Sequence, residues 1–211
     1  MSLEWIVSSI RWLGGLLAYS ILGFLLYGIW RGTRREAGRL SGRTGAWFHS
    51  PAFYLAGSVI YLGISWLGWV PLPLHFPSFT RIVMLTIGSL FYFPGLIFLL
   101  RSRLELGDNY FVSTSWGAQI FKDQPLFTTG PYAIVRHPMY TGLILAAVGS
   151  LLIYFTWTTV LFAVIAPCIL MRARREEAVL LAEFGEVWQE YCKRVPPFFP
   201  RISRWGSDAN V

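Results

Sequence analysis

The sequence predicts an all-α, polytopic membrane protein with about five transmembrane helices, and three observations lead to this fold class. The chain of 211 residues is 55% hydrophobic and only 14% charged, whereas a soluble domain carries roughly a quarter charged residues. Acidic and basic residues are absent from the long stretches 12–30, 51–76, 82–100 and 138–171, and roughly 20 apolar residues are enough to span a bilayer. Basic residues gather between these stretches and after the last of them, as the positive-inside rule expects of cytoplasmic segments.

Residues 1–100 are predicted to form an N-terminal membrane region of three spans with short connections. Pro71, Pro73 and Pro77 mark the turn between the second and third spans because proline interrupts regular structure. The chain before the first span contains Glu4 and no basic stretch, so we interpret this span as a retained helix instead of a cleaved signal. Counting basic residues places the N-terminus outside and the active site and C-terminus in the cytoplasm.

The apolar stretch 140–171 is too long for one crossing. Its 32 residues would form a helix of about 48 Å, against a hydrocarbon core of about 30 Å. We therefore predict a helical hairpin with a turn near residues 155–158. Gly142, Ala146 and Ser150 recur every four residues, and such a face of small residues lets helices approach closely. The hairpin would bring residues 130–140 and 172–177 to the same edge of the membrane.

The hairpin is predicted to lead into a cytoplasmic amphipathic helix over residues 172–195. Apolar side chains recur there at three- and four-residue spacing, and glutamates occupy the other face, which is typical of a helix that lies on an interface. Pro196 and Pro197 would end this helix. Residues 101–211 are thus expected to form a second region, made of a cytoplasmic loop, the hairpin and the C-terminal helix.

Six polar residues are predicted to meet where the hairpin begins and ends. They are Arg136, His137, Tyr140, Arg172, Glu176 and Glu177. Charged groups near a membrane core are costly and are functional candidates for that reason. The simpler alternative is an ion-pair cluster that anchors the hairpin at the interface. The residues alone do not decide between these two explanations.

The run from Gly130 to Gly142, with the sequence GPYAIVRHPMYTG, resembles the signature of the isoprenylcysteine carboxyl methyltransferase family and its bacterial relatives. A second part of the resemblance follows at Arg172 with Glu176 and Glu177, and continues through residues 184–196. The resemblance covers about residues 120–200, and the first three spans match only in number and hydrophobicity. It implies a membrane methyltransferase that uses S-adenosylmethionine and no metal, and that acts on a lipophilic small-molecule or lipidated acceptor, with a carboxylate as one candidate.

The resemblance also implies roles for individual residues. The cofactor contacts would be Gln124, Leu126, Phe127, Tyr132, Arg136, His137, Met139, Tyr140 and Glu176. Gln124, Leu126 and Phe127 match more loosely, and the family often has a histidine at the position of Gln124. Arg172 would face the methyl acceptor and is the catalytic candidate. Gly142 would either clear space for the cofactor or allow close helix packing.

Other functions remain open at this stage. Relatives of the same superfamily methylate phospholipid amines or small thiols, and membrane sterol reductases with a similar C-terminal layout use a nicotinamide cofactor. A non-enzymatic scaffold whose basic loops hold membrane lipid is a further alternative. The net charge of +7 follows the loops between spans, so we attribute it to topology and expect no nucleic-acid partner.

Overall fold

The computed structural model describes residues 3–32, 34, 51–110 and 125–200, and these parts of the chain form an all-α fold. The helices follow one another as α1 (Leu3–Gly32), α2 (Pro51–Leu67), α3 (Ser78–Leu106), the short 3-10 turn η2 (Gly107–Asn109), α4 (Pro131–Ile134), α5 (Pro138–Tyr154), α6 (Trp157–Ile165) and α7 (Cys168–Arg194). The all-α part of the predicted fold class is confirmed.

Among the described residues, three helical stretches are long and apolar enough to cross a membrane: α1, α3 with η2, and the stretch Trp157–Arg194 that contains α6 and α7. The helices α2 and α5 are also apolar but shorter. The chain is therefore an integral membrane protein with several membrane helices. The count of five crossings and their orientation stay predictions.

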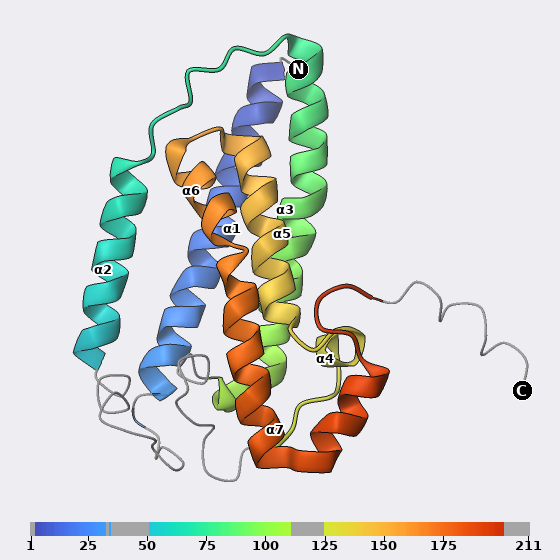
Figure 1. Cartoon of the computed structure of the whole chain (residues 1–211). Helices are drawn as coiled ribbons and strands as arrows, with labels where there is room; N and C mark the ends of the chain where they lie inside the picture. The colour runs from blue at the N-terminus through green and yellow to red at the C-terminus, as the bar shows by residue number, and fades with distance from the viewer. Residues whose placement is uncertain (1–2, 33, 35–50, 111–124, 201–211) are drawn as a thin grey trace, which may run out of the picture.

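Glycines bring α3 and α5 into close contact, side by side along most of their lengths (Figure 1). A Cβ atom on Gly142 would lie 2.6 Å from the carbonyl oxygen of Gly95, and one on Gly149 would lie 2.4 Å from the backbone nitrogen of Tyr92. Such distances leave no room for a side chain, so the two backbones touch. Close packing thus accounts for Gly142, one of the two roles left open above.

The hairpin turn lies inside the predicted interval. Helix α5 ends at Tyr154, and Phe155 adopts the left-handed conformation with φ 52°. Thr156 then caps α6 through a reciprocal pair of hydrogen bonds with Thr159, which satisfies backbone donors at the start of the helix. Helix α6 has only nine residues, and α7 begins again after the turn at Ala166 and Pro167.

Helix α7 differs from the predicted C-terminal helix in two ways. It begins at Cys168, before the predicted start at residue 172, and it is bent at Gly185, where φ is 53° and ψ is −121°. Only glycine adopts such an angle pair without strain. The bend turns the last part of α7 back toward α4 (Figure 1), so that Trp188, Tyr191 and Val195 are buried in a small apolar cluster.

Replacing Gly185 by alanine is expected to destabilise the protein by about 1–3 kcal/mol, because the positive φ becomes strained. Nothing lies within 4 Å of a Cβ atom placed there, so the loss would come from the backbone alone. Gly63→Ala in α2 is the control, since that site is equally open and helical. Thermal unfolding in detergent should show a lower midpoint for Gly185→Ala only. Equal midpoints for the two variants would contradict the bend.

Candidate active site

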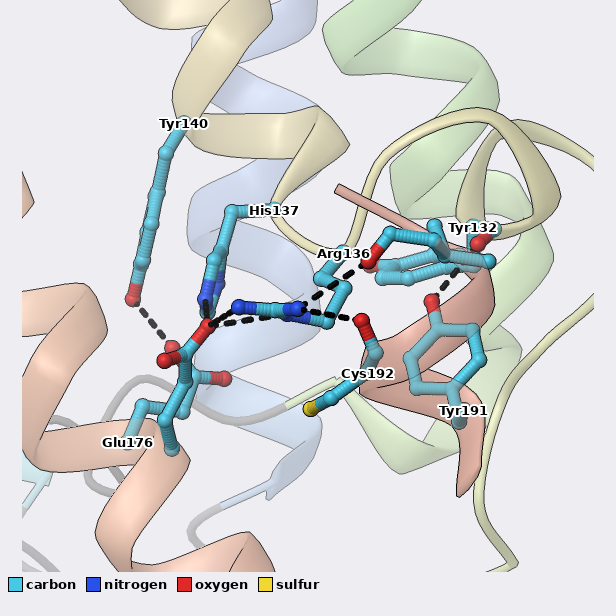
Figure 2. A network of polar contacts seen from close by, with 9 residues as sticks. Tyr132, Arg136, His137, Tyr140, Glu176, Tyr191 and Cys192 are labelled. Atoms are coloured by element: carbon cyan, nitrogen blue, oxygen red, sulfur yellow. Dashed lines mark hydrogen bonds and ion pairs between the residues drawn. The ribbon is translucent and has the colours of Figure 1, made fainter. Parts of the chain in front are cut away.

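Glu177 of α7 joins two residues from the start of α5. Its Oε1 atom accepts hydrogen bonds from Nε and Nη2 of Arg136, at 3.0 and 2.8 Å, and lies 2.9 Å from Nε2 of His137. The His137 and Arg136 side chains are 4% and 12% exposed. Figure 2 shows the Arg136 and His137 side chains pointing toward the same region. A charged hydrogen-bonded cluster therefore ties the start of α5 to α7.

Glu176, the neighbouring residue, contacts a different partner. The Tyr140 hydroxyl donates a hydrogen bond of 2.8 Å to Oε2 of Glu176 (Figure 2). The Arg172 guanidinium lies 6.0 Å from the centre of the Tyr140 ring, a distance at which a cation still interacts with an aromatic face. Arg172 and Glu176 are one helical turn apart, so both lie beside Tyr140.

The C-terminal end of the described chain encloses the same cluster. Nη1 of Arg136 donates to the backbone carbonyl oxygens of Cys192 and Val195, at 3.2 and 3.0 Å. The backbone nitrogens of Arg136 and His137 donate to the carbonyls of Pro196 and Pro197. The bend at Gly185 makes these contacts possible because it returns the end of α7 to the start of α5.

Tyr132 in α4 lies on the other side of the cluster (Figure 2). Its carbonyl oxygen accepts a hydrogen bond of 2.6 Å from the Tyr191 hydroxyl, and its ring lies 6.4 Å from that of Phe127. Burial, together with the nearby carboxylate of Glu176, raises the pKa of the Tyr132 phenol well above its usual range. The phenol is therefore neutral and can donate a hydrogen bond or offer an apolar ring face.

The structure brings most of the predicted site residues into one region. Tyr140 donates to Glu176 and has Arg172 beside its ring, while Arg136 and His137 meet through Glu177. Other predicted contacts lie nearby: Leu126 packs on the apolar cluster of α7, and Met139 is half-buried in the first turn of α5. Gln124 lies outside the described residues.

Two residues were not among the predicted contacts. Glu177 belonged to the polar set but received no role, although it is the acceptor that binds both Arg136 and His137. Burial raises the pKa of the Tyr110 phenol, which follows η2, to about 12. The charges of Arg172 and Glu176 also act on this phenol. The guanidinium of Arg103 lies 4.4 Å from the centre of its ring. No motif marks Tyr110, so only its position in space reveals it.

The fold and this cluster define a class of protein: a helical membrane protein with a polar site where α4, α5 and α7 meet. Residues 105–182, which contain the whole hairpin and the first part of α7, match the model of the isoprenylcysteine carboxyl methyltransferase (ICMT) family. Through this segment the chain is similar to the ICMT family.

Individual relatives agree with this assignment. The chain is 35% identical over 136 residues to the protein-S-isoprenylcysteine O-methyltransferase of Schizosaccharomyces pombe, covering 61% of this chain and 56% of that protein. It is 29% identical over 195 residues to methanethiol S-methyltransferase 2 of Bradyrhizobium diazoefficiens, covering 89% of this chain and 58% of that protein. It is also 39% identical over 74 residues to a Delta(14)-sterol reductase of Mus musculus, covering 34% of this chain and 18% of that protein. The matched parts thus span little more than half of the two methyltransferases.

Proposed function

We propose that this chain is a membrane methyltransferase that uses S-adenosylmethionine and acts on a lipophilic acceptor. The observation that carries the proposal is the hydrogen bond between Tyr140 and Glu176, with Arg172 beside the same ring. All three residues lie inside the segment that matches the ICMT family. They come from two helices that the hairpin turns toward each other, so the site exists only in the folded chain.

The residues at the cluster fit this cofactor. Tyr140 donates to Oε2 of Glu176, and among the described residues no donor reaches its Oε1, which can accept from an ammonium group or a ribose hydroxyl. The neutral Tyr132 ring can pack on a flat base. Arg136 and His137 are bonded to Glu177. We therefore propose that both position Glu177 and the C-terminal segment, and their direct contact with the cofactor stays a prediction.

The proposed reaction requires positioning more than acid–base catalysis. When bound, S-adenosylmethionine supplies a methyl group on a cationic sulfur, and the methyl–sulfur bond breaks, its electron pair staying on sulfur, as an acceptor atom bonds to the methyl carbon. Arg172 would hold the acceptor in line with that bond, and alignment of this kind contributes several kcal/mol to catalysis. For a carboxylate acceptor, the opposite charges of acceptor and donor would cancel in the transition state, which a water-poor site favours.

The relatives differ in the methyl acceptor that their names give. The relative named for isoprenylcysteine takes a carboxylate on a lipidated residue, and the relative named for methanethiol takes a small thiol. We propose that residues 1–100 serve the acceptor and residues 101–211 the cofactor, because the family match begins at residue 105. Charge counting supports a site on the cytoplasmic side, with the N-terminus outside.

Titration of the detergent-purified protein tests the cofactor. We expect S-adenosylmethionine to bind in isothermal titration calorimetry and NADPH to give no heat. Binding of NADPH alone would support the reductase alternative, to which the likeness with the sterol reductase points. If neither compound binds, the result would support the alternative of a non-enzymatic membrane scaffold. Incubation with methyl-labelled cofactor and, in turn, a prenylated cysteine, methanethiol or phosphatidylethanolamine would identify the acceptor.

Glu176→Gln is expected to weaken S-adenosylmethionine binding about 10- to 100-fold, because a hydrogen bond to a charged group contributes roughly 1.5–3 kcal/mol. Glu183→Gln is the matched control: it lies on the same helix, and its side chain is exposed. The dissociation constants of the two variants and the unchanged protein are compared by calorimetry. Equal affinities for all three would remove Glu176 from the cofactor site.

A further inference from the structure

Arg103, near the end of α3, is a buried cation that the proposed site does not yet use. Its side chain belongs to a residue that is only 5% exposed, and its Nη1 donates a hydrogen bond of 2.7 Å to the carbonyl oxygen of Gly107. Within the described part of the chain, its Nε is buried without a hydrogen-bond partner and it forms no ion pair. Asp108, whose charge acts on Arg103, is paired with Arg31. A buried charge without a counter-ion is costly, so an anionic ligand nearby would stabilise it.

The surroundings of Arg103 fix its guanidinium and, through it, the ring of Tyr110. A Cβ atom on Gly28 of α1 would collide with Nη2 of Arg103, so glycine at that position leaves room for the guanidinium. Its Cζ atom lies 4.9 Å from the centre of the Phe24 ring and 4.4 Å from the centre of the Tyr110 ring. A cation is attracted to an aromatic face at such distances. Arg103 therefore holds the Tyr110 ring at the end of α3.

The backbone before Tyr110 is fixed as well. Gly107 ends α3 with a φ of 51°, an angle that favours glycine. Nη1 of Arg31 in α1 then lies 2.9 Å from Oδ1 of Asp108 in η2. This ion pair is exposed and contributes little stability, but it joins η2 to α1. Tyr110 therefore follows a turn whose position both neighbouring helices define.

The Tyr110 hydroxyl lies at the polar cluster. The charges of Arg172 and Glu176 act on this phenol, and the phenol acts in turn on that of Tyr132. A phenol carries its charge on oxygen, so it is the hydroxyl end of Tyr110 that lies near these groups. With a pKa of about 12 the phenol is protonated at neutral pH. Among the described residues it donates to no acceptor, which leaves its proton for a ligand.

The proposed cofactor presents an anion that has no partner so far. S-adenosylmethionine carries its ammonium and its carboxylate on the same carbon atom, so the protein groups that bind them must lie close together. Oε1 of Glu176 can accept from the ammonium, whereas Arg136 and His137 are already bonded to Glu177. The carboxylate therefore needs a donor beside Glu176, and the Tyr110 hydroxyl is such a donor.

We propose that Tyr110 donates a hydrogen bond to the carboxylate of S-adenosylmethionine, and that Arg103 is a positioning residue, which holds the Tyr110 ring and places a positive charge behind it. This inference rests on the proposed methyltransferase function and adds a carboxylate subsite at the end of α3. Arg103 lies outside the segment that matches the family, and Tyr110 lies inside it. The subsite needs a neutral phenol, because a phenolate would repel the carboxylate.

Decarboxylated S-adenosylmethionine tests the subsite, because it keeps the sulfonium, the amine and the adenosine but lacks the carboxylate. Calorimetry on one detergent-purified preparation gives the dissociation constants of both compounds. We expect the unchanged protein to bind S-adenosylmethionine more tightly than the decarboxylated compound. Tyr110→Phe removes only the hydroxyl and should weaken S-adenosylmethionine binding about tenfold, the effect of one hydrogen bond to a charged group. The affinity for the decarboxylated compound should stay the same in this variant.

Variants of Arg103 test its positioning role. Arg103→Met removes the charge and should weaken S-adenosylmethionine binding about as much as Tyr110→Phe. In the double variant the two losses should not add, because one residue acts through the other. Arg103→Lys keeps the charge without the planar guanidinium and should recover part of the affinity. The matched controls are Arg101→Met on the same helix and Tyr19→Phe in α1, both at exposed positions, and they should change neither affinity.

The ratio of the two dissociation constants separates this inference from a folding defect and from the proposed function. A general defect lowers both affinities together and leaves the ratio unchanged. If the unchanged protein binds S-adenosylmethionine and Tyr110→Phe keeps the ratio, the carboxylate subsite is overturned while the methyltransferase proposal stands. A ratio that falls in Tyr110→Phe but not in Arg103→Met would overturn the positioning role of Arg103. If the unchanged protein binds neither compound, the proposed function is overturned and the subsite with it.

Discussion

Arg172→Ala is expected to lower methyl transfer at least 100-fold while the affinity for S-adenosylmethionine changes less than twofold. The guanidinium lies 6.0 Å from the centre of the Tyr140 ring and also lines an apolar cavity of about 400 Å³ between α1 and α2. It therefore stands between the proposed cofactor site and the N-terminal helices that are proposed to serve the acceptor. Removing it would leave the acceptor without its charged anchor, and misplacement of about 1 Å costs on the order of 10²-fold in rate.

The measurement for Arg172 is a pair of assays on one preparation. Incorporation of label from methyl-labelled cofactor into an organic extract gives the rate, and calorimetry gives the cofactor affinity. Arg174→Ala is the matched control because Arg174 lies on the same helix and is exposed; it should keep the rate within twofold. Loss of cofactor affinity in Arg172→Ala would assign Arg172 to the cofactor and refute its acceptor role.

Gly149→Ala is expected to destabilise the protein by about 3 kcal/mol, a large effect for one methyl group. The added Cβ atom would lie 2.4 Å from the nitrogen and 2.8 Å from the Cα of Tyr92, and 2.7 Å from the carbonyl oxygen of Gly88. These are backbone atoms of α3, so the contact is relieved only by moving α3 away from α5. Overpacking of this kind costs typically 1–3 kcal/mol, occasionally more.

The control for Gly149→Ala is Gly23→Ala, which is expected to stabilise the protein instead of destabilising it. A Cβ atom on Gly23 in α1 would meet nothing within 4 Å, and alanine is favoured over glycine in a helix by about 1 kcal/mol. Gly23→Ala should therefore raise the unfolding midpoint in detergent while Gly149→Ala lowers it. A midpoint for Gly149→Ala equal to that of the unchanged protein would refute the close contact of α3 and α5.

Much of the fold could be predicted because its signals are local. Apolar stretches without charges mark the membrane helices, and the length of residues 140–171 alone requires a hairpin. The turn was expected near residues 155–158 and lies at Phe155 and Thr156. The bend at Gly185 was not predicted, because the apolar spacing continues on both sides of it and a single glycine is compatible with a helix.

The candidate site was predictable as a set of residues but not as a set of contacts. The polar residues at the two ends of the hairpin were expected to meet, and they do. The partners were not foreseen: His137 pairs with Glu177, whereas Tyr140 pairs with Glu176. Adjacent residues of a helix point about 100° apart, so the rotation of α7 against α5 decides which carboxylate reaches which partner.

By itself the sequence determined that this protein is a helical membrane protein with a C-terminal hairpin and a polar cluster at the hairpin's base, because hydrophobicity and chain length act along the chain. Only the tertiary structure decided that the end of α7 returns to Arg136, that Tyr110 lies beside the cluster, and that α1 and α2 each line two adjoining cavities. Those features depend on how helices rotate and pack against one another, which no local pattern records.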